Sequence, residues 1–258
     1  MMLPIRPSTP AAGAGSADDA EPTLSTPILP TPALTAPVED YLKAIYELET
    51  RLGNAATSDV ADALDVAPAS ATGMIRRLAT QGYLDHVPYR GVQLTETGRR
   101  AALRTIRRHR ILETYLSRVL GYPWDLVHDE AERLEHAASD ALVARMAAAL
   151  DNPTEDPHGA PIPTAEGTVD ERALRTIADL AVGERARMVR VSDRDGALLR
   201  YLAEIALQPG VEVQVMARAP FGGPLSLRIG SNQLMVGPSL AGQVLVEAIA
   251  DPDAPDRP

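Results

Sequence analysis

The chain lacks cysteine altogether and has only one Trp and one Phe among its 258 residues. Without cysteine it can form no disulfide bond, no thiolate zinc site and no cysteine nucleophile. Since 45% of the residues are apolar, the cores must be built mainly from Leu, Val, Ile and Ala. A chain of this length can hold more than one domain.

The sequence also contains no apolar run of about 20 residues, the length that a membrane-spanning helix needs. A signal peptide, with its charged and then apolar segments, is equally missing. We therefore expect a cytoplasmic protein with no membrane partner.

The signatures of common enzyme classes are missing too. We find no nucleophile-and-base set, and Gly222 and Gly223 belong to a turn without the lysine of a phosphate-binding loop. A di-metal enzyme on a helical bundle would need paired Glu-x-x-His motifs, whereas Glu132-x-x-Glu135-His136 occurs once. We expect that the protein is not an enzyme.

The net charge of −10 is unevenly distributed along the chain. Residues 38–110 hold eleven Lys and Arg against nine Asp and Glu, a net charge of +2, which leaves −12 for the rest. A locally basic segment inside an acidic protein is compatible with DNA binding. The first 36 residues are rich in Pro, Ala, Thr and Ser, and we expect 1–36 and 251–258 to be disordered tails.

Residues 37–98 predict three helices followed by a β-hairpin. The expected helices span 37–51, 57–64 and 69–81, and the expected strands span 83–87 and 92–95. Two helices joined by a tight turn, followed by a hairpin, indicate a winged helix-turn-helix DNA-binding domain. The alternative is a small α+β module with no role in DNA binding.

The third helix would be the recognition helix, and the hairpin would be the wing. The candidate DNA-binding residues are Ala69, Ser70, Thr72, Gly73, Arg76 and Arg77 on this helix, with Arg90 on the wing. Short side chains read bases weakly, through hydroxyl groups and contacts with thymine methyls. We therefore expect phosphate contacts and DNA shape to supply much of the affinity.

Residues 99–150 predict a helical domain. A long helix is expected over 99–120, a second from the His128 region to about Asp140, and a further helical piece to Leu150. Their wide apolar faces suggest packing against a second copy of the chain, although any core helix has such a stripe. His109 and Glu113 lie one turn apart on one face of the long helix.

The stretch 128–136 carries the strongest chemical signal. On a helix, His128, Glu132, Glu135 and His136 fall within roughly 100° of one another. Two imidazoles and two carboxylates on one stripe form a suitable ligand set for a divalent first-row metal. The alternative is a solvated acidic face with incidental histidines.

The remainder predicts a linker and a small β domain. Residues 151–175 form a Pro/Gly-rich linker, and a short helix is expected near 170–180. Strands are expected at 185–192, 211–217, 225–229, 232–236 and 243–248, with a helix over 197–207. Five short strands indicate an SH3-like β-barrel over 176–250.

Several of these motifs together resemble the diphtheria toxin repressor family of metal-dependent transcriptional regulators. The resemblance rests on Asp40–Leu48, Pro68–Leu78, Tyr89-Arg90-Gly91, Arg107–Arg110 and His128–His136. It implies a mainly α protein with a small β part: a winged helix-turn-helix, a helical dimerisation domain and a C-terminal SH3-like barrel. Its partners would be an operator in double-stranded DNA and a second copy in a homodimer.

The resemblance also implies two metal sites. The first would consist of Asp40, Glu132, Glu135 and His136, and the second of His109, Glu113 and His128. Asp193 and Asp195 in the barrel are candidates for extra ligands of the first site. In the family's anion site Arg110 is kept, but Asp156 and Ala160 replace Ser and Asn, so we expect no anion there.

The metal is expected to be Mn²⁺, with Fe²⁺ or another divalent transition metal as the alternative. Iron-responsive members have Met and Cys where this chain has Asp40 and Glu132, and carboxylate oxygens suit a hard ion better. The resemblance is therefore to the manganese transport regulator branch. That branch has a carboxylate where this chain has Lys43, which favours two separated sites over a binuclear cluster.

The expected function is a Mn²⁺-dependent repressor that controls metal homeostasis. Four carboxylates from three helices would repel one another without metal, and bound metal would order a homodimer for a palindromic operator. The alternatives are an Fe²⁺-responsive regulator of the same family and a winged-helix regulator that senses a non-metal ligand.

Overall fold

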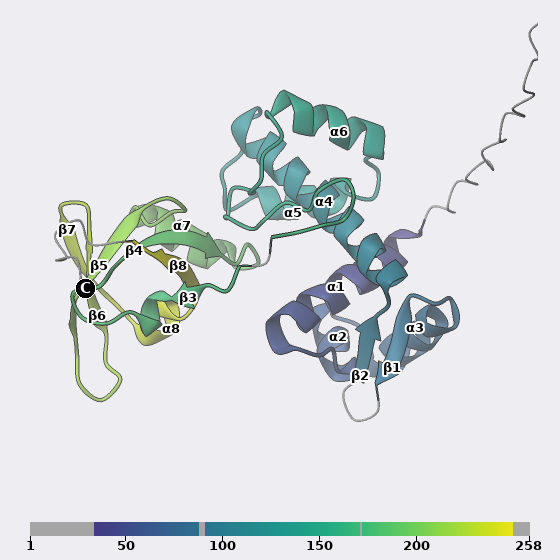
Figure 1. Ribbon diagram of the computed structural model, residues 1–258, viewed down its shortest axis with the longest axis horizontal. Coiled ribbons are helices and arrows are strands. Elements are labelled where there is room, and N and C mark those ends of the chain that lie inside the picture. Colours follow the sequence, from purple (N-terminus) through teal and green to yellow (C-terminus); the bar gives the residue numbers. More distant parts are fainter. Residues whose placement is uncertain (1–33, 88–90, 171, 250–258) are drawn as a thin grey trace, which may run out of the picture. The chain divides into compact units, whose positions relative to one another are not determined.

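A computed structural model describes residues 34–87, 91–170 and 172–249 (Figure 1). The expected tails and Arg90 lie outside these residues, apart from Leu34, Thr35 and Ala36 at the end of the first tail. Within the described residues, no helix is long and apolar enough to cross a membrane.

The N-terminal domain is the winged helix-turn-helix that the sequence predicts. Its elements are α1 (Ala36–Leu52), α2 (Thr57–Ala63), α3 (Pro68–Thr80), β1 (Leu84–Val87) and β2 (Gly91–Leu94). β1 and β2 pair antiparallel, with Leu84 opposite Leu94. The apolar side of α1 is fully covered, since Leu42 and Ile45 are 0% exposed and pack with Leu78 of α3 in one core.

The helical domain consists of α4 (Glu96–Arg118), α5 (Val127–Leu134) and α6 (Asp140–Ala149). Thr95 caps α4 by accepting a hydrogen bond from the Gly98 amide at 3.1 Å. The prediction of one helix from the His128 region to Asp140 is wrong, because α5 ends at Leu134 and a turn precedes α6. Glu135 nevertheless keeps helical dihedral angles (φ −59°, ψ −35°), so it continues the face that α5 begins.

The Pro/Gly-rich segment 151–170 is folded against its neighbours. Glu155 and Pro161 form an antiparallel bridge, and Ile162 packs with Ile111 and Val143 in a small core. Asp156 and His158 are buried, at 4% and 0% exposure. This segment therefore places polar side chains inside the molecule instead of only joining two domains.

The C-terminal domain is a six-stranded antiparallel sheet of SH3-like type, in the order β3-β8-β4-β5-β6-β7. The strands are β3 (Arg175–Thr176), β4 (Arg185–Val191), β5 (Glu212–Arg218), β6 (Leu225–Ile229), β7 (Asn232–Val236) and β8 (Val244–Ala248). The helices α7 (Gly196–Glu204) and α8 (Pro238–Ala241) accompany them (Figure 1). Its core is separate and aliphatic, as the composition predicts.

The prediction of a helix near 170–180 is wrong. Arg175 and Thr176 instead pair with β8, and only Ile177–Asp179 forms a 3₁₀ turn. The Asp179 carboxylate accepts hydrogen bonds from the Thr176 amide and hydroxyl, and these bonds stabilise the short 3₁₀ turn. A pairing with a strand about 70 residues away overrides the local helical pattern.

Gly159 fixes the path of the 151–170 segment. It adopts φ +84°, and a Cβ atom there would lie 1.7 Å from the backbone oxygen of Val189 in β4. Gly167 has almost the same φ, +83°, but its nearest neighbour would be the Arg100 Cγ atom at 3.5 Å. Both glycines would suffer backbone strain if replaced by alanine, but only at Gly159 would the added Cβ atom also collide with a neighbouring strand.

We expect Gly159→Ala to lower the free energy of unfolding more than Gly167→Ala does. Both variants lose about 1–2 kcal/mol from the left-handed backbone, and Gly159→Ala loses roughly 2 kcal/mol more because β4 must move. Urea denaturation followed by circular dichroism measures the difference. Equal losses in the two variants would mean that this contact is not tight.

Candidate metal centre

Helices α1, α4 and α5 bring most of the predicted ligands around one cavity of about 540 Å³. Its lining includes Asp40, Lys43, His109, His128, Glu132, His136 and Asp193. The side chains form two clusters, one at the α1–α5 contact and one deeper along α4. His109 belongs to the cluster along α4 and to a group with Glu132 and Glu135 that adjoins the first cluster.

The first cluster joins Asp40 of α1 to Glu135 and His136, which follow α5. The His136 Nε2 atom lies 2.8 Å from the Asp40 Oδ1 atom and 3.5 Å from the Glu135 Oε1 atom. The opposite nitrogen, Nδ1, lies 2.7 Å from Glu39, whose carboxylate also accepts a hydrogen bond from Arg108 at 2.9 Å. Glu39 thus turns the Nε2 atom of His136 towards the other two ligands.

Glu132, expected in the same set, lies in an adjoining group with His109 and Glu135. The Lys43 ammonium stands among these three residues. Its Nζ atom forms an ion pair with Glu132 and lies 2.9 Å from the Glu135 Oε2 atom and 3.2 Å from the His109 Nδ1 atom. The same ammonium also donates to the Glu135 Oε1 atom at 3.2 Å, the oxygen that lies 3.5 Å from the His136 Nε2 atom, so Lys43 contacts both oxygens of Glu135.

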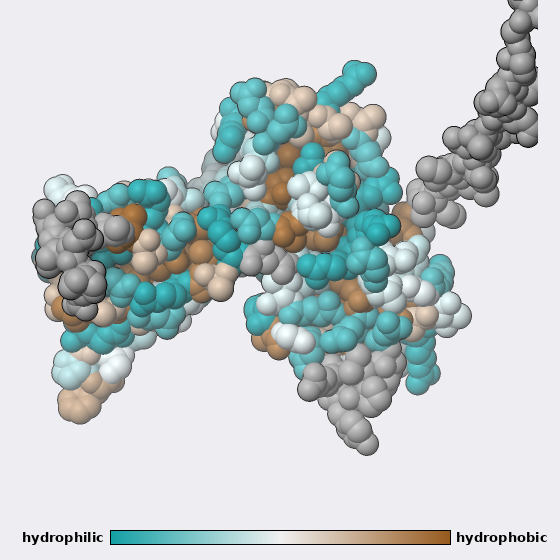
Figure 2. Space-filling view, viewed as in Figure 1, coloured by the Kyte–Doolittle hydropathy of each residue, from teal (hydrophilic) through white to brown (hydrophobic). Residues whose placement is uncertain are grey.

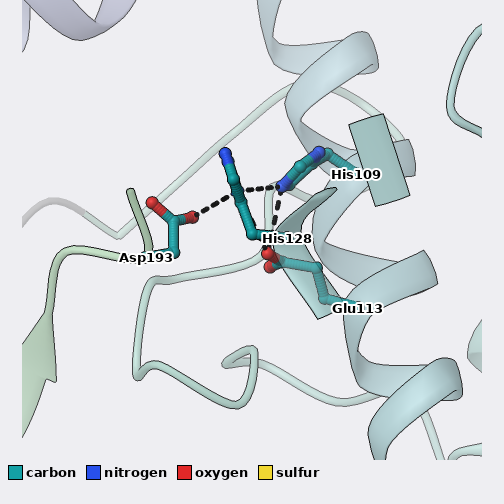
Figure 3. A group of neighbouring side chains, drawn as sticks. All are labelled: His109, Glu113, His128 and Asp193. Carbon is teal, nitrogen blue, oxygen red and sulfur yellow. Dashed lines mark hydrogen bonds and ion pairs between the residues drawn. The ribbon is translucent and has the colours of Figure 1, made fainter. Parts of the chain in front are cut away.

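The second cluster contains His109, Glu113, His128 and Asp193 (Figure 3). The His109 Nε2 atom lies 3.1 Å from the Glu113 Oε1 atom, and the His128 Nδ1 atom lies 3.5 Å from the same oxygen. His128 is also 3.4 Å from the Asp193 Oδ2 atom. Asp193 therefore lies in the second cluster, whereas the sequence analysis expected it as an extra ligand of the first site.

Asp195, the other expected extra ligand, belongs to neither cluster. Its carboxylate caps α7 by accepting hydrogen bonds from the Ala197 and Leu198 amides, each at 3.0 Å.

Two residues that the sequence analysis did not assign as ligands, Asp156 and His158, adjoin Glu113. The His158 Nε2 atom donates to the Trp124 carbonyl at 2.7 Å, which leaves its Nδ1 atom to face Glu113 at 3.8 Å. One Asp156 oxygen accepts from the amides of His158 and Ala160, at 2.8 and 2.9 Å. The spacing Asp-x-His is the sequence signal that could have found them.

Four buried atoms around Glu113 suit a metal ion. Among the described residues, both Glu113 oxygens, the Asp156 Oδ2 atom and the His158 Nδ1 atom are buried without a hydrogen bond. Buried polar atoms are nearly always hydrogen-bonded, so such a group needs an explanation. Two carboxylates and imidazole nitrogens that face one another fit a divalent cation.

Protons balance the charge of the second cluster when metal is absent. Burial lowers the pKa of His128, but Asp193 and Glu113 outweigh it and raise the pKa to about 10. In the same way, burial lowers the pKa values of His109 and His158, and Glu113 raises each to about 9. These imidazoles must lose a proton before they can bind a metal ion.

The surface of α3 matches the expected DNA-binding face. Ala69, Ser70, Gly73, Arg76 and Arg77 are exposed. Thr72 is half-buried, and its hydroxyl donates to the Pro68 carbonyl at 2.8 Å, which leaves its methyl group and its oxygen lone pair for other contacts.

Comparisons with known proteins agree with this arrangement. The model of the iron dependent repressor N-terminal DNA binding domain matches residues 33–92, and that of its metal binding and dimerisation domain matches 95–164. The iron-dependent repressor IdeR of Mycobacterium tuberculosis is 30% identical over 223 residues, which cover 82% of this chain and 96% of IdeR. The chain belongs to the iron-dependent repressor family. A FeoA domain model also matches residues 175–248, the SH3-like domain.

The similar proteins include family members whose names refer to different metals. The diphtheria toxin repressor of Corynebacterium efficiens is 31% identical over 189 residues, which cover 69% of this chain and 82% of that repressor. A manganese-dependent transcriptional repressor, solved in complex with manganese, is 41% identical with a TM-score of 0.75, covering 82% of this chain and all of its own. The chain is thus a metal-dependent DNA-binding repressor, and its relatives respond to iron or manganese.

We expect the metal-free protein to lose stability between pH 7 and pH 9.5. The pKa values of His109, His128 and His158 rise from 6.5 in the unfolded chain to about 9 or 10 in the folded one. Their stabilisation is therefore complete below pH 6.5 and is lost as the pH rises through the folded values. Urea midpoints measured in a chelator check this, and a midpoint that rises with pH would contradict it.

Proposed function

We propose that this chain is a Mn²⁺-responsive transcriptional repressor of metal-homeostasis genes that binds DNA as a homodimer. One observation carries the proposal: Asp40 is on the first helix of the DNA-binding domain, whereas Glu135 and His136 belong to the helical domain, and their ligand atoms meet. An ion held by all three would tie the two domains together.

The donor set supports Mn²⁺ over Fe²⁺. Asp40 and Glu135 offer carboxylate oxygens and His136 an imidazole nitrogen, and Glu132 adds a further carboxylate within reach of His109. Hard oxygen donors favour Mn²⁺, which lies at the weak end of the Irving–Williams order and must be selected by geometry and ligand type. The manganese-dependent repressor solved with manganese agrees with this choice.

We assign Asp156 and His158 to the second site, together with Glu113, His128, Asp193 and His109. The Glu113 Oε1 atom faces nitrogens of His109, His128 and His158, at 3.1, 3.5 and 3.8 Å, so one carboxylate oxygen and three imidazoles converge on the same place. Asp193 comes from the SH3-like domain, and it would make that domain part of the metal response.

A homodimer would follow from the exposed apolar side chains of the helical domain. These are Val119, Leu120, Tyr122, Leu126, Leu134 and Leu142, and Figure 2 shows apolar residues on this part of the surface among hydrophilic ones. A dimer presents two α3 helices to successive major grooves, about 34 Å apart. Fixing α1 through Asp40 would fix that spacing and couple metal binding to binding of a palindromic operator.

We expect gel-shift titration to show operator binding at least tenfold tighter with Mn²⁺ than in chelator. Asp40→Ala should remove most of this difference, because it deletes the only first-cluster ligand on α1, and Asp59→Ala on the exposed start of α2 is the control. Equal affinity with and without metal in the unmodified chain would refute the coupling.

The metal preference has its own test. Asp40→Met combined with Glu132→Cys replaces hard oxygens with soft sulfur, and it should shift the DNA-binding response from Mn²⁺ towards Fe²⁺. An unchanged preference under anaerobic conditions would mean that selectivity lies outside these two positions.

His158→Gln tests the second site. This variant keeps a hydrogen-bond donor for the Trp124 carbonyl but removes the imidazole that faces Glu113. We expect one Mn²⁺ equivalent per chain to bind at least tenfold more weakly in calorimetric titration, while the first equivalent is unchanged. Two unaltered equivalents would remove His158 from the ligand set.

A further inference from the structure

Lys43 is the only lysine in the chain; the other 24 basic residues of the Lys and Arg total of 25 are arginines. It is also buried, at 8% exposure, and its ammonium stands among His109, Glu132 and Glu135, next to the first cluster. A sequence that uses arginine everywhere else retains a compact ammonium group at one interior position.

We propose that the Lys43 ammonium is a built-in cation that occupies the His109–Glu132–Glu135 group and so limits the first cluster to one metal ion. By the same contacts it holds α1 against α4 and α5 before metal binds. This inference rests on the proposed function, since it assumes that the Asp40 side of the cluster takes a metal ion.

The geometry supports a cation position rather than an incidental ion pair. The ligand atoms of His109, Glu132 and Glu135 lie within 4.8 Å of one another, which is the arrangement of a metal site. The Lys43 Nζ atom contacts all three residues, with 2.9 Å to Glu135 and 3.2 Å to His109. A divalent ion in the same group would lie next to the ammonium, and the two positive charges would repel strongly at low dielectric.

The choice of lysine also has a physical reason. An ammonium is a compact point charge with three donors, whereas a guanidinium is a planar fork. Lys43 donates to Glu132 and to both oxygens of Glu135, and its Nζ atom lies 3.2 Å from the His109 Nδ1 atom. The Glu135 Oε1 atom is the farther of the two from the ammonium, at 3.2 against 2.9 Å, and it also faces the His136 Nε2 atom at 3.5 Å, so the Asp40–His136 side keeps a carboxylate donor.

The same contacts make α1 partly attached in the metal-free protein. Glu135 is 0% exposed, and removal of Lys43 would take away the ammonium that pairs with its carboxylate and leave His109, whose Nδ1 atom lies 2.6 Å from the Oε2 atom. Removing one member of a buried ion pair is strongly destabilising because the other member stays charged in the interior. Metal bound by Asp40, Glu135 and His136 would add a second link between α1 and the helical domain to the one that Lys43 provides.

Metal stoichiometry tests the first part of the proposal. Lys43→Glu turns the cation into a fourth donor, and we expect it to bind one more Mn²⁺ per chain than the unmodified protein in equilibrium dialysis with elemental analysis. Arg51→Glu, with the same charge change on the exposed end of α1, should bind no extra ion. Lys43→Gln removes the positive charge from the His109–Glu132–Glu135 group without adding a carboxylate. We expect this variant also to bind one additional Mn²⁺ per chain, but more weakly than Lys43→Glu does.

Thermal unfolding in chelator tests the second part. We expect Lys43→Met to melt about 5 °C or more below the unmodified protein, and Arg51→Met to melt within 1–2 °C of it, roughly the effect of a surface substitution. The increase in melting temperature caused by Mn²⁺ should be larger in Lys43→Met than in the unmodified chain.

The outcomes separate this inference from the proposed function. If folded Lys43→Glu and Lys43→Gln bind no extra Mn²⁺, or if the unmodified chain already binds that equivalent, Lys43 does not limit the cluster. An unchanged melting temperature of metal-free Lys43→Met would overturn the attachment of α1. Failure of the unmodified chain to bind Mn²⁺ would instead refute the proposed function, while the chelator measurement would still decide the role of Lys43.

Discussion

Closing α1 onto α4 and α5 buries carboxylates, and the need to balance their charge governs the rest of the structure. Glu113 and Glu135 are both 0% exposed, and Glu39 is 7% exposed. Each is paired with cations: protonated histidines beside Glu113, Lys43 and His109 beside Glu135, and Arg108 and His136 beside Glu39. A buried anion is tolerated only when it is paired, so the domains can meet without metal only because these cations are present.

The cations differ in how easily they can be replaced. Arg108 is permanently charged and holds Glu39, which orients His136. Lys43 is covalently part of α1, and it donates to both oxygens of Glu135. The protons of His128 and His158 differ from these cations, because a metal ion bound at the same nitrogens would displace them. Metal binding at the second cluster would therefore release protons.

Much of this could be predicted from periodicity and spacing. The helix expected over 37–51 agrees with α1, and the spacing of His109 with Glu113 and of His128 with Glu132 placed these side chains on shared faces, because helix geometry is local. Asp156 and His158 were missed since Pro and Gly mark a linker, and only tertiary contacts bury that segment. The expectation of mutually repelling carboxylates overlooked Lys43 for the same reason: its partners are 66 to 92 residues away.

One backbone hydrogen bond gives the SH3-like domain a further significance. The Val191 amide donates to the His158 carbonyl at 3.0 Å, at the end of β4 and two residues before Asp193. His158 and Asp193, which are distant in sequence, are therefore connected through one backbone hydrogen bond to β4. A displacement of the SH3-like domain that moved Asp193 away from His128 would also pull on the segment that carries His158.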